Sequence, residues 1–168
     1  MHEASARDGC GFAPIRSRAG VGWRDHEWPE GHAEPVPLRR PTRPEGFLSD
    51  LKAAHEIQDD TFVAVGYGLL DGWPPPNLVT NEDRWYVTSP YGSLKKNNLH
   101  LQQNPVSTGQ GGTCFGDSGG PHFWQDTLII ASVTSWGDAV CRSNDQTQRI
   151  DLPSVLDWLQ EEFGVTPA

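Results

Sequence analysis

The sequence predicts a fold built mainly from β-strands, followed by one C-terminal helix. Its 18 glycines and 14 prolines favour turns and strands over long helices. Several short runs of β-branched and aromatic residues stop at glycine, proline or polar residues, which is typical of strands. A final segment carries apolar residues at helical spacing. We therefore expect an all-β domain with a terminal helix.

Residues 1–45 differ in composition from the rest of the chain. They contain seven arginines but no lysine, seven acidic residues, six prolines and five glycines, with almost no apolar periodicity. Such a segment buries little apolar area. We predict an irregular segment over residues 1–45 and a folded domain over residues 46–168, which carries the whole formal charge of −9.

The folded domain opens with a predicted short helix and continues as strands. The helix is indicated by apolar residues at helical spacing: Phe47, Leu48, Leu51, Ala54 and Ile57. The predicted strands cover residues 61–67, 85–88, 99–101, 121–124 and 128–136. The last two flank a turn at Gln125-Asp126, which indicates a hairpin.

The C-terminal helix is predicted from Leu152, Val155, Leu156, Leu159 and Phe163, which share one helical face. Asp151 is the expected cap of this helix, and Pro153 suits its first turn. We expect the helix to pack on the sheet.

Charge and apolar run lengths exclude several classes of function. A net charge of −9 argues against nucleic acid and anionic membranes as partners. The longest apolar run, residues 128–136, is far below the ~20 residues that cross a bilayer. The glycines around Gln110 lack the lysine and helix of a phosphate loop, and neither a metal site nor a cofactor is predicted.

The run Gly116-Asp117-Ser118-Gly119-Gly120-Pro121 is the strongest chemical signal. Six specified residues arise by chance in a given window at on the order of 10⁻⁷. Glycines let the backbone turn so that successive N–H groups point at one spot beside an exposed hydroxyl. Ser118 is therefore the candidate nucleophile, and the amides of Gly116 and Ser118 form the candidate oxyanion hole.

Several further motifs accompany this run. Cys114 stands four residues before Ser118, Ser135-Trp136-Gly137 follows the predicted hairpin, and Cys141 comes shortly after. With the strand Val65-Gly66-Tyr67-Gly68 and the run 148–151, they make residues 46–168 resemble the C-terminal half of the chymotrypsin-like serine proteases. The resemblance implies a six-stranded antiparallel second β-barrel and a serine endopeptidase acting through an acyl-enzyme on Ser118.

The resemblance also implies how a peptide substrate is held. It implies a disulfide between Cys114 and Cys141 that fixes two loops lining the primary specificity pocket; two buried free thiols are the alternative. The edge formed by Ser135, Trp136 and Gly137 is expected to pair with the substrate, although Trp136 in the core remains the alternative. Gly112 stands where trypsin-like enzymes carry an aspartate, so the pocket floor is expected to be uncharged. Asp138 and Asp145, placed in loops, are candidates for charge at its rim.

The partners that activate the serine are not identifiable in the sequence. A serine hydroxyl needs a histidine base and an orienting carboxylate, and in the family both come from the first barrel. Five of the six histidines are interpreted as structural or solvent-exposed rather than catalytic: His26, His32, His55, His100 and His122. In the family, the aspartate at the position of Asp117 forms an ion pair with a new N-terminus that zymogen cleavage makes. No such terminus is visible, so Asp117 is expected to be unpaired.

Three accounts of the chain remain open. The preferred one is a truncated or wrongly started serine protease, since one event explains the missing triad partners, the absence of a visible signal peptide and the extra Cys10. The second is a half-protease without activity that serves as a peptide-binding or interaction module. The third is a fragment that complements a separate first-barrel lobe. Secretion is expected from the resemblance, and self-association from the uncovered flank of the barrel.

Overall fold

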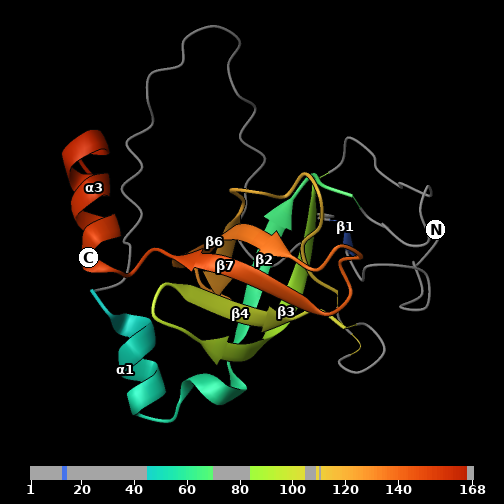
Figure 1. Ribbon diagram of the computed structural model, residues 1–168, viewed down its shortest axis with the longest axis horizontal. Helices are drawn as coiled ribbons and strands as arrows, with labels where there is room; N and C mark the ends of the chain where they lie inside the picture. The colour runs from blue at the N-terminus through green and yellow to red at the C-terminus, as the bar shows by residue number, and fades with distance from the viewer. Residues whose placement is uncertain (1–12, 15–44, 70–83, 105–108, 110, 166–168) are drawn as a thin grey trace, which may run out of the picture.

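The central feature of the computed structural model is a closed six-stranded antiparallel β-barrel (Figure 1). The structure describes residues 13–14, 45–69, 84–104, 109 and 111–165. The barrel strands are β2 (Thr61–Gly66), β3 (Trp85–Leu94), β4 (Asn98–Gln102), β5 (Pro121–Trp124), β6 (Ile130–Gly137) and β7 (Asn144–Arg149). They pair in the order β2-β3-β4-β7-β6-β5, and β5 pairs back with β2. The predicted all-β barrel is confirmed.

Three helical elements and one very short strand accompany the barrel. Helix α1 (Phe47–Ala53) and the 3-10 helix η1 (Ile57–Asp59) precede β2, and helix α3 (Pro153–Phe163) follows β7. The two-residue strand β1 (Ala13–Pro14) pairs with β3. Apart from these two residues and Glu45, the predicted irregular segment over residues 1–45 lies outside the described residues.

The barrel interior contains two apolar clusters and several buried polar side chains. Fully buried apolar side chains from α1, η1 and three strands form the main cluster: Leu48, Ile57, Phe62, Leu99, Leu101 and Ala131. The second cluster includes Cys114, which precedes the candidate nucleophile by four residues. The buried polar side chains include Asp117, next to the candidate nucleophile in the chain.

The first helix is shorter than the sequence predicted. Helix α1 ends at Ala53, and His55 adopts a left-handed backbone conformation with φ of 60°. Because this conformation interrupts a right-handed helix, Ile57 belongs to η1, where it is still fully buried. Four of the five predicted apolar positions are buried or half-buried, whereas Ala54, just after the end of α1, is exposed.

Strand β3 is longer than predicted, because it continues through Ser89 and Pro90 to Leu94. Pro90 pairs with Thr61 at the start of β2, and the ladder to β4 begins only at Tyr91. Ser89 is fully buried and its hydroxyl donates to the carbonyl of Gly111. The serine and proline therefore lie within the strand rather than ending it.

Strand β7 was not predicted, since its sequence contains no apolar residue. Its inward face is polar and buried, with Asp145, Thr147 and Arg149. The Thr147 hydroxyl lies 2.8 Å from that of Ser132 and donates to the carbonyl of Leu99. These hydrogen bonds provide partners for polar groups that are buried where an apolar residue would otherwise lie.

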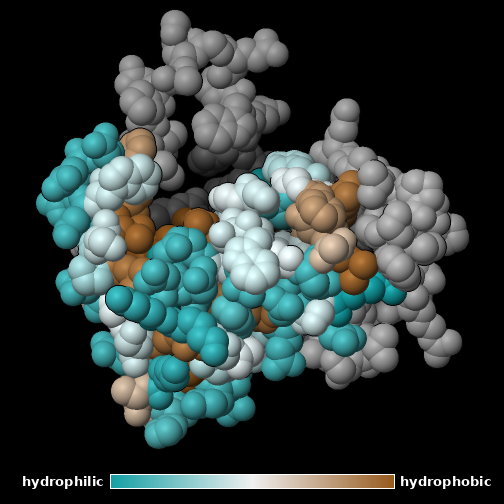
Figure 2. Space-filling model, viewed as in Figure 1, coloured by the Kyte–Doolittle hydropathy of each residue, from teal (hydrophilic) through white to brown (hydrophobic). Residues whose placement is uncertain are grey.

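The C-terminal helix begins at Pro153 as expected, but Asp151 is not its cap. The N-cap is Leu152, and the Asp151 carboxylate instead accepts hydrogen bonds from the backbone of Leu48 and from Arg149. In α3 only Leu156 is buried, whereas Trp158 and Phe163 are exposed and pack edge to face. Figure 2 shows hydrophobic surface where α3 leaves the barrel. No helix in the described part of the chain is long and apolar enough to cross a membrane.

Candidate active site

Ser118 lies on an exposed loop that leads into β5. Gly116 and Gly119 have φ of 99° and 82°, a backbone region that only glycine adopts freely. The amide of Asp117 donates to the carbonyl of Cys114, and the amide of Gly119 donates to the carbonyl of Thr134 in β6. The amides of Gly116 and Ser118 donate to no acceptor within the described ranges.

The Asp117 side chain lies beneath this loop and is buried. Its Oδ1 accepts from the amide of Gly68 at 2.7 Å, and its Oδ2 accepts from the amide of Cys114 at 2.9 Å. Asp117 is therefore hydrogen-bonded to two amides, although no ion pair joins it to another described residue. Burial is the largest influence and raises the pKa of Asp117, although the two amide hydrogen bonds oppose it.

Two glycines of β2 and its following turn make room for Asp117. A Cβ atom built on Gly66 would lie 2.0 Å from Asp117 Oδ1, and one built on Gly68 would lie 2.5 Å from Asp117 Cγ. Side chains at either position would displace the carboxylate. The glycines of the 65–68 motif thus support the loop that carries Ser118.

The end of β6 has a backbone edge on the β5 side with which no strand of the described residues pairs. Pairing between β5 and β6 stops at Val133, whereas Trp136 and Gly137 still pair with β7 on the other side. Ser135, Trp136 and Gly137 are exposed, and Trp136 is 57% exposed, so this tryptophan is not part of the core. A free strand edge of this kind accepts an extended peptide by strand addition.

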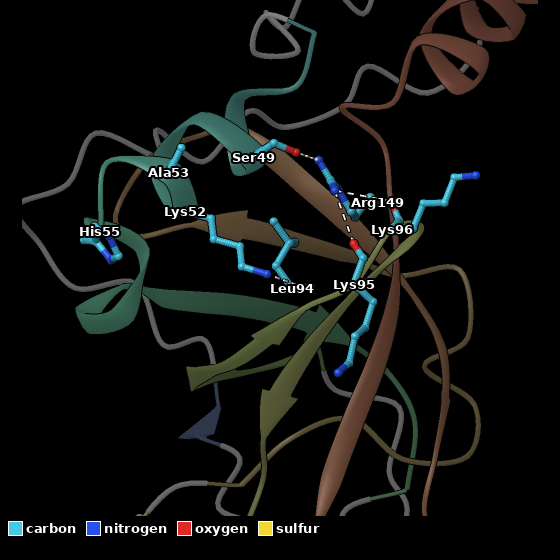
Figure 3. Close-up of a pocket in the computed structure, with 8 residues that line it drawn as sticks. All are labelled: Ser49, Lys52, Ala53, His55, Leu94, Lys95, Lys96 and Arg149. Atoms are coloured by element: carbon cyan, nitrogen blue, oxygen red, sulfur yellow. Dashed lines mark hydrogen bonds between the residues drawn. The ribbon is translucent and has the colours of Figure 1, made fainter.

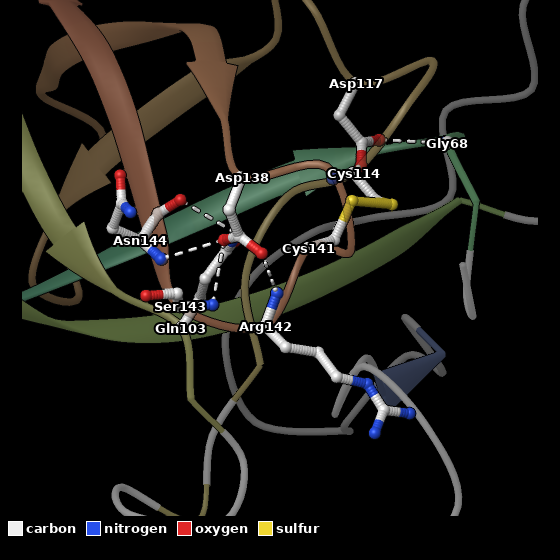
Figure 4. Close-up of a disulfide and its surroundings, with 9 residues drawn as sticks. All are labelled: Gly68, Gln103, Cys114, Asp117, Asp138, Cys141, Arg142, Ser143 and Asn144. Carbon is white, nitrogen blue, oxygen red and sulfur yellow. Dashed lines mark hydrogen bonds between the residues drawn. A yellow bond between two sulfur atoms is a disulfide. The ribbon is translucent and has the colours of Figure 1, made fainter. Parts of the chain in front are cut away.

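Cys114 and Cys141 form a disulfide, which joins the segment before Ser118 to the loop after β6 (Figure 4). Within that loop, Asp138 accepts hydrogen bonds from the amides of Arg142, Ser143 and Asn144. Burial raises the pKa of Asp138, but these bonds and one from Gln103 outweigh it, so the net pKa is lowered. The Asp138 carboxylate therefore organises the loop.

Gly112 packs against a side chain that the sequence analysis did not single out. Gln103 follows β4 and is fully buried, and its Nε2 donates to the carbonyl of Asn144. A Cβ atom on Gly112 would lie 2.1 Å from Gln103 Oε1. Only glycine fits at residue 112, because Gln103 fills the volume that a side chain there would need. Nothing in the local sequence pattern marks Gln103, because the contact joins separate strands.

Asp145 lies inside the barrel on β7 rather than in a loop, so its predicted location was wrong. His122 Nε2 lies 3.0 Å from Asp145 Oδ2, and both side chains are fully buried. The two residues come from strands on either side of β6. His122 is structural in this arrangement, as the sequence analysis interpreted it.

The structure brings none of the described histidines to the candidate nucleophile. Over residues 45–69, 84–104, 109 and 111–165, no hydrogen bond joins Ser118 to a histidine. His100 lies within β4, where burial and then the charge of Lys95 lower its pKa. His26 and His32 lie outside the described residues.

His55 lines a separate hollow between α1 and the β3–β4 turn, far along the chain from Ser118 (Figure 3). Its lining includes all three lysines of the chain: Lys52, Lys95 and Lys96. Lys52 donates to the carbonyl of Leu94, while Lys95 and Lys96 extend in different directions. Arg149 is held by Asp151 at 2.7 Å. The cations do not converge on one point.

The described residues contain no group of three or more histidine, cysteine or acidic side chains that could hold a metal ion. The arrangement around Ser118 instead combines an exposed hydroxyl, two amides without acceptors and an open strand edge. These are the parts that acyl transfer from a bound peptide requires, apart from the base.

Comparisons with known proteins agree with this geometry. The family profile described as Trypsin matches residues 36–159. The chain is 32% identical to serine protease 1 of Drosophila melanogaster over 107 residues, which cover 62% of this chain and 40% of the relative. It is 35% identical to brachyurin of Leptuca pugilator over 78 residues, covering 46% and 32% of the two chains.

A mutant of human heparin binding protein aligns with a TM-score of 0.47 and 24% identity, covering 66% of this chain and 48% of that one. The chain thus matches less than half the length of the curated relatives. Because the family profile spans most of the chain and includes the Ser118 loop, the chain belongs to the trypsin family of serine proteases.

Proposed function

We propose that this chain forms the nucleophile-bearing lobe of a serine endopeptidase. In the proposed reaction, Ser118 Oγ bonds to the carbonyl carbon of a peptide bond while a histidine base takes the hydroxyl proton. The amine then leaves with that proton, and water hydrolyses the acyl-enzyme to free Ser118. The Gly116 and Ser118 amides stabilise the oxyanion in both steps.

The observation that carries this proposal is the pair of amides without acceptors beside an exposed serine. The amides of Asp117 and Gly119, which alternate with them, donate to the carbonyls of Cys114 and of Thr134 in β6. Asp117 holds the loop from below through Gly68 and Cys114. Two backbone donors that are free to bind the same oxygen form the usual receptor for a developing negative charge.

Substrate binding is assigned to Gly112 and to the edge formed by Ser135, Trp136 and Gly137. Among the described residues, no strand pairs with this edge on the Ser118 side, so an extended peptide gains main-chain hydrogen bonds there. Exposed Trp136 supplies apolar contact area for the side chains of the bound peptide. Peptides and proteins are therefore the proposed substrates, and the disulfide suits secretion into an oxidising compartment.

The base is proposed to come from a first-barrel lobe that the described residues do not contain. Activity is then proposed to require an assembly of both lobes. The first-barrel lobe is either lost from a truncated product or supplied by another chain. A second function follows if no base is supplied, because the open edge next to Trp136 still binds peptides without cleaving them. The chain would then act as an interaction module.

Labelling of the purified, folded chain with a fluorophosphonate tests the proposal. Rapid formation of an adduct on Ser118, absent in Ser118→Ala and retained in the exposed-serine control Ser154→Ala, shows an activated nucleophile. If no adduct forms, the measurement is repeated with a first-barrel lobe of a related protease added. Labelling only in the mixture supports complementation. Peptide binding without labelling in either sample favours the interaction module.

A further inference from the structure

The hollow between α1 and the β3–β4 turn collects all three lysines of the chain, although the chain as a whole carries a net charge of −9. Its volume is about 490 Å³. Lys52 comes from α1, whereas Lys95 and Lys96 lie in the turn that joins β3 to β4 (Figure 3). No acidic residue stands among the described residues that line it. The hollow is therefore a locally positive region on an acidic protein.

The charges of these lysines are not balanced by acidic neighbours. Within the described ranges, no ion pair joins Lys52, Lys95 or Lys96 to an acidic side chain. All three side chains are exposed. Lys52 Nζ donates to the carbonyl of Leu94 at 3.0 Å, which leaves this ammonium group two further N–H donors. The lysines can therefore bind an anionic ligand without breaking an ion pair.

Arg149 holds the two walls of the hollow together. It is buried, and the Asp151 carboxylate 2.7 Å away neutralises its charge. Its Nη1 donates to the carbonyls of Lys95 and Lys96 at 3.3 Å each, and its Nη2 donates to Ser49 Oγ in α1. One side chain thus ties the β3–β4 turn to α1. Because both walls are already in place, a ligand has less of the protein to order when it binds.

His55 completes the wall that α1 supplies. Its φ of 60° lies in the left-handed region, which is uncommon for residues other than glycine. The turn that this conformation makes brings His55 to the hollow instead of continuing α1 (Figure 3). Backbone conformations of this kind cluster at functional sites. The exposed imidazole adds a ring nitrogen that can donate a hydrogen bond to an oxyanion.

The spread of the cations decides the kind of ligand. Because the lysine side chains extend in different directions, a single phosphate or sulfate ion cannot contact all of them (Figure 3). A small molecule with several such groups can do so, and each contact after the first forms within a complex that already exists. The flexible four-carbon stem of lysine lets each ammonium group follow the ligand. A long polyanion that extends beyond the hollow is repelled by the net charge of −9.

We propose that this hollow binds a small ligand that carries several phosphate or sulfate groups, and that Lys52, Lys95 and Lys96 contact those groups. The volume of about 490 Å³ is within the range of small-molecule sites. A bound ligand joins α1 to the β3–β4 turn, as Arg149 does from the buried side. The proposal goes beyond the peptidase reaction, since no residue of the hollow belongs to the site around Ser118.

The test is an NMR titration of the whole chain at low salt with inositol hexakisphosphate and with inositol hexasulfate. The two probes share one ring and differ in their anionic groups. At least one of them is expected to bind at least about 10-fold more tightly than inorganic phosphate or sulfate, and uncharged inositol is expected not to bind. The tighter of the two probes identifies the preferred group. A smaller ratio for both probes, or no binding of either, would overturn the proposal.

Variants locate the binding. The double variant Lys95→Gln and Lys96→Gln should weaken binding of the tighter probe about 3- to 30-fold, and adding Lys52→Gln should weaken it further. Arg84→Gln with Arg142→Gln makes the same change in net charge outside the hollow and should change the affinity by less than about 2-fold. Equal losses in the two double variants, or none in the lysine variant, would refute binding in the hollow. The replaced lysines are exposed, so we expect these variants to fold.

Discussion

Removal of the disulfide tests how firmly the loop before Ser118 depends on the loop after β6. The perturbation is the double substitution Cys114→Ala and Cys141→Ala, made in a Cys10→Ser background so that no free thiol can form another bridge. Both bridged cysteines are buried, at 7% and 4% exposure, so alanine fits without introducing a polar group. The change therefore removes the covalent link and little else.

The magnitude follows from the length of chain that the bridge closes. The two cysteines are 27 residues apart in the sequence, and their Cα atoms are 5.3 Å apart in the fold. The loop-closure relation gives about 3.5 kcal/mol of stability for a loop of this length. Native domains are stable by ~5–15 kcal/mol, so the loss is a large part of the total.

Urea unfolding followed by tryptophan fluorescence measures the effect. The reference protein is the Cys10→Ser single variant, and peptide mapping without reductant verifies the Cys114–Cys141 link. The free energy of unfolding should fall by about 3.5 kcal/mol in the double variant. A loss below about 1 kcal/mol, with the link verified in the reference protein, would show that the bridge does not constrain the unfolded chain as argued.

Three further sets of variants test the supports of the site and core by urea unfolding. Gly112→Ala should cost about 1–3 kcal/mol because of the clash with Gln103, and Gln103→Ala should recover part of it; additive losses would contradict this. Burial raises the pKa of Asp117, so its contribution to stability is present below the usual value of 3.8 and is lost as pH rises through the raised pKa. The stability of the native chain relative to Asp117→Asn should therefore fall as pH rises above about 4, and a constant difference would refute this. Phe62→Ala, at a fully buried position, should cost about 3–5 kcal/mol, whereas Tyr67→Ala, 58% exposed, should cost about 0.5 kcal/mol or less; similar costs would contradict the assigned core.

The elements that the sequence predicted well are those in which local chemistry and tertiary environment agree. Strand β2 and the β5–β6 hairpin contain β-branched and aromatic residues, and each is a strand in the barrel. Strand β7 was not predicted because its buried face consists of polar and charged residues: Asp145, Thr147 and Arg149. Their partners come from elsewhere in the chain, and no local pattern reveals them.

The candidate site also has one part that the sequence predicted and another that it did not. The run from Gly116 to Pro121 is contiguous, so the sequence alone identified Ser118 and the amides next to it. The partners of Asp117 could not be predicted, because Gly68 is 49 residues away and reaches the carboxylate only when the barrel closes. The position of Asp145 against His122 depends on the strand order around β6.

The sequence by itself determined the family, the all-β class, the C-terminal helix and the candidate nucleophile, because each depends on a short run of residues whose conformation is set locally. Only the tertiary structure decided where charge is buried. It paired Asp117 with two amides, filled the space beside Gly112 with Gln103 and paired Asp145 with His122. The physical reason is that electrostatics and packing depend on distances through space, which barrel closure fixes between residues far apart in the chain.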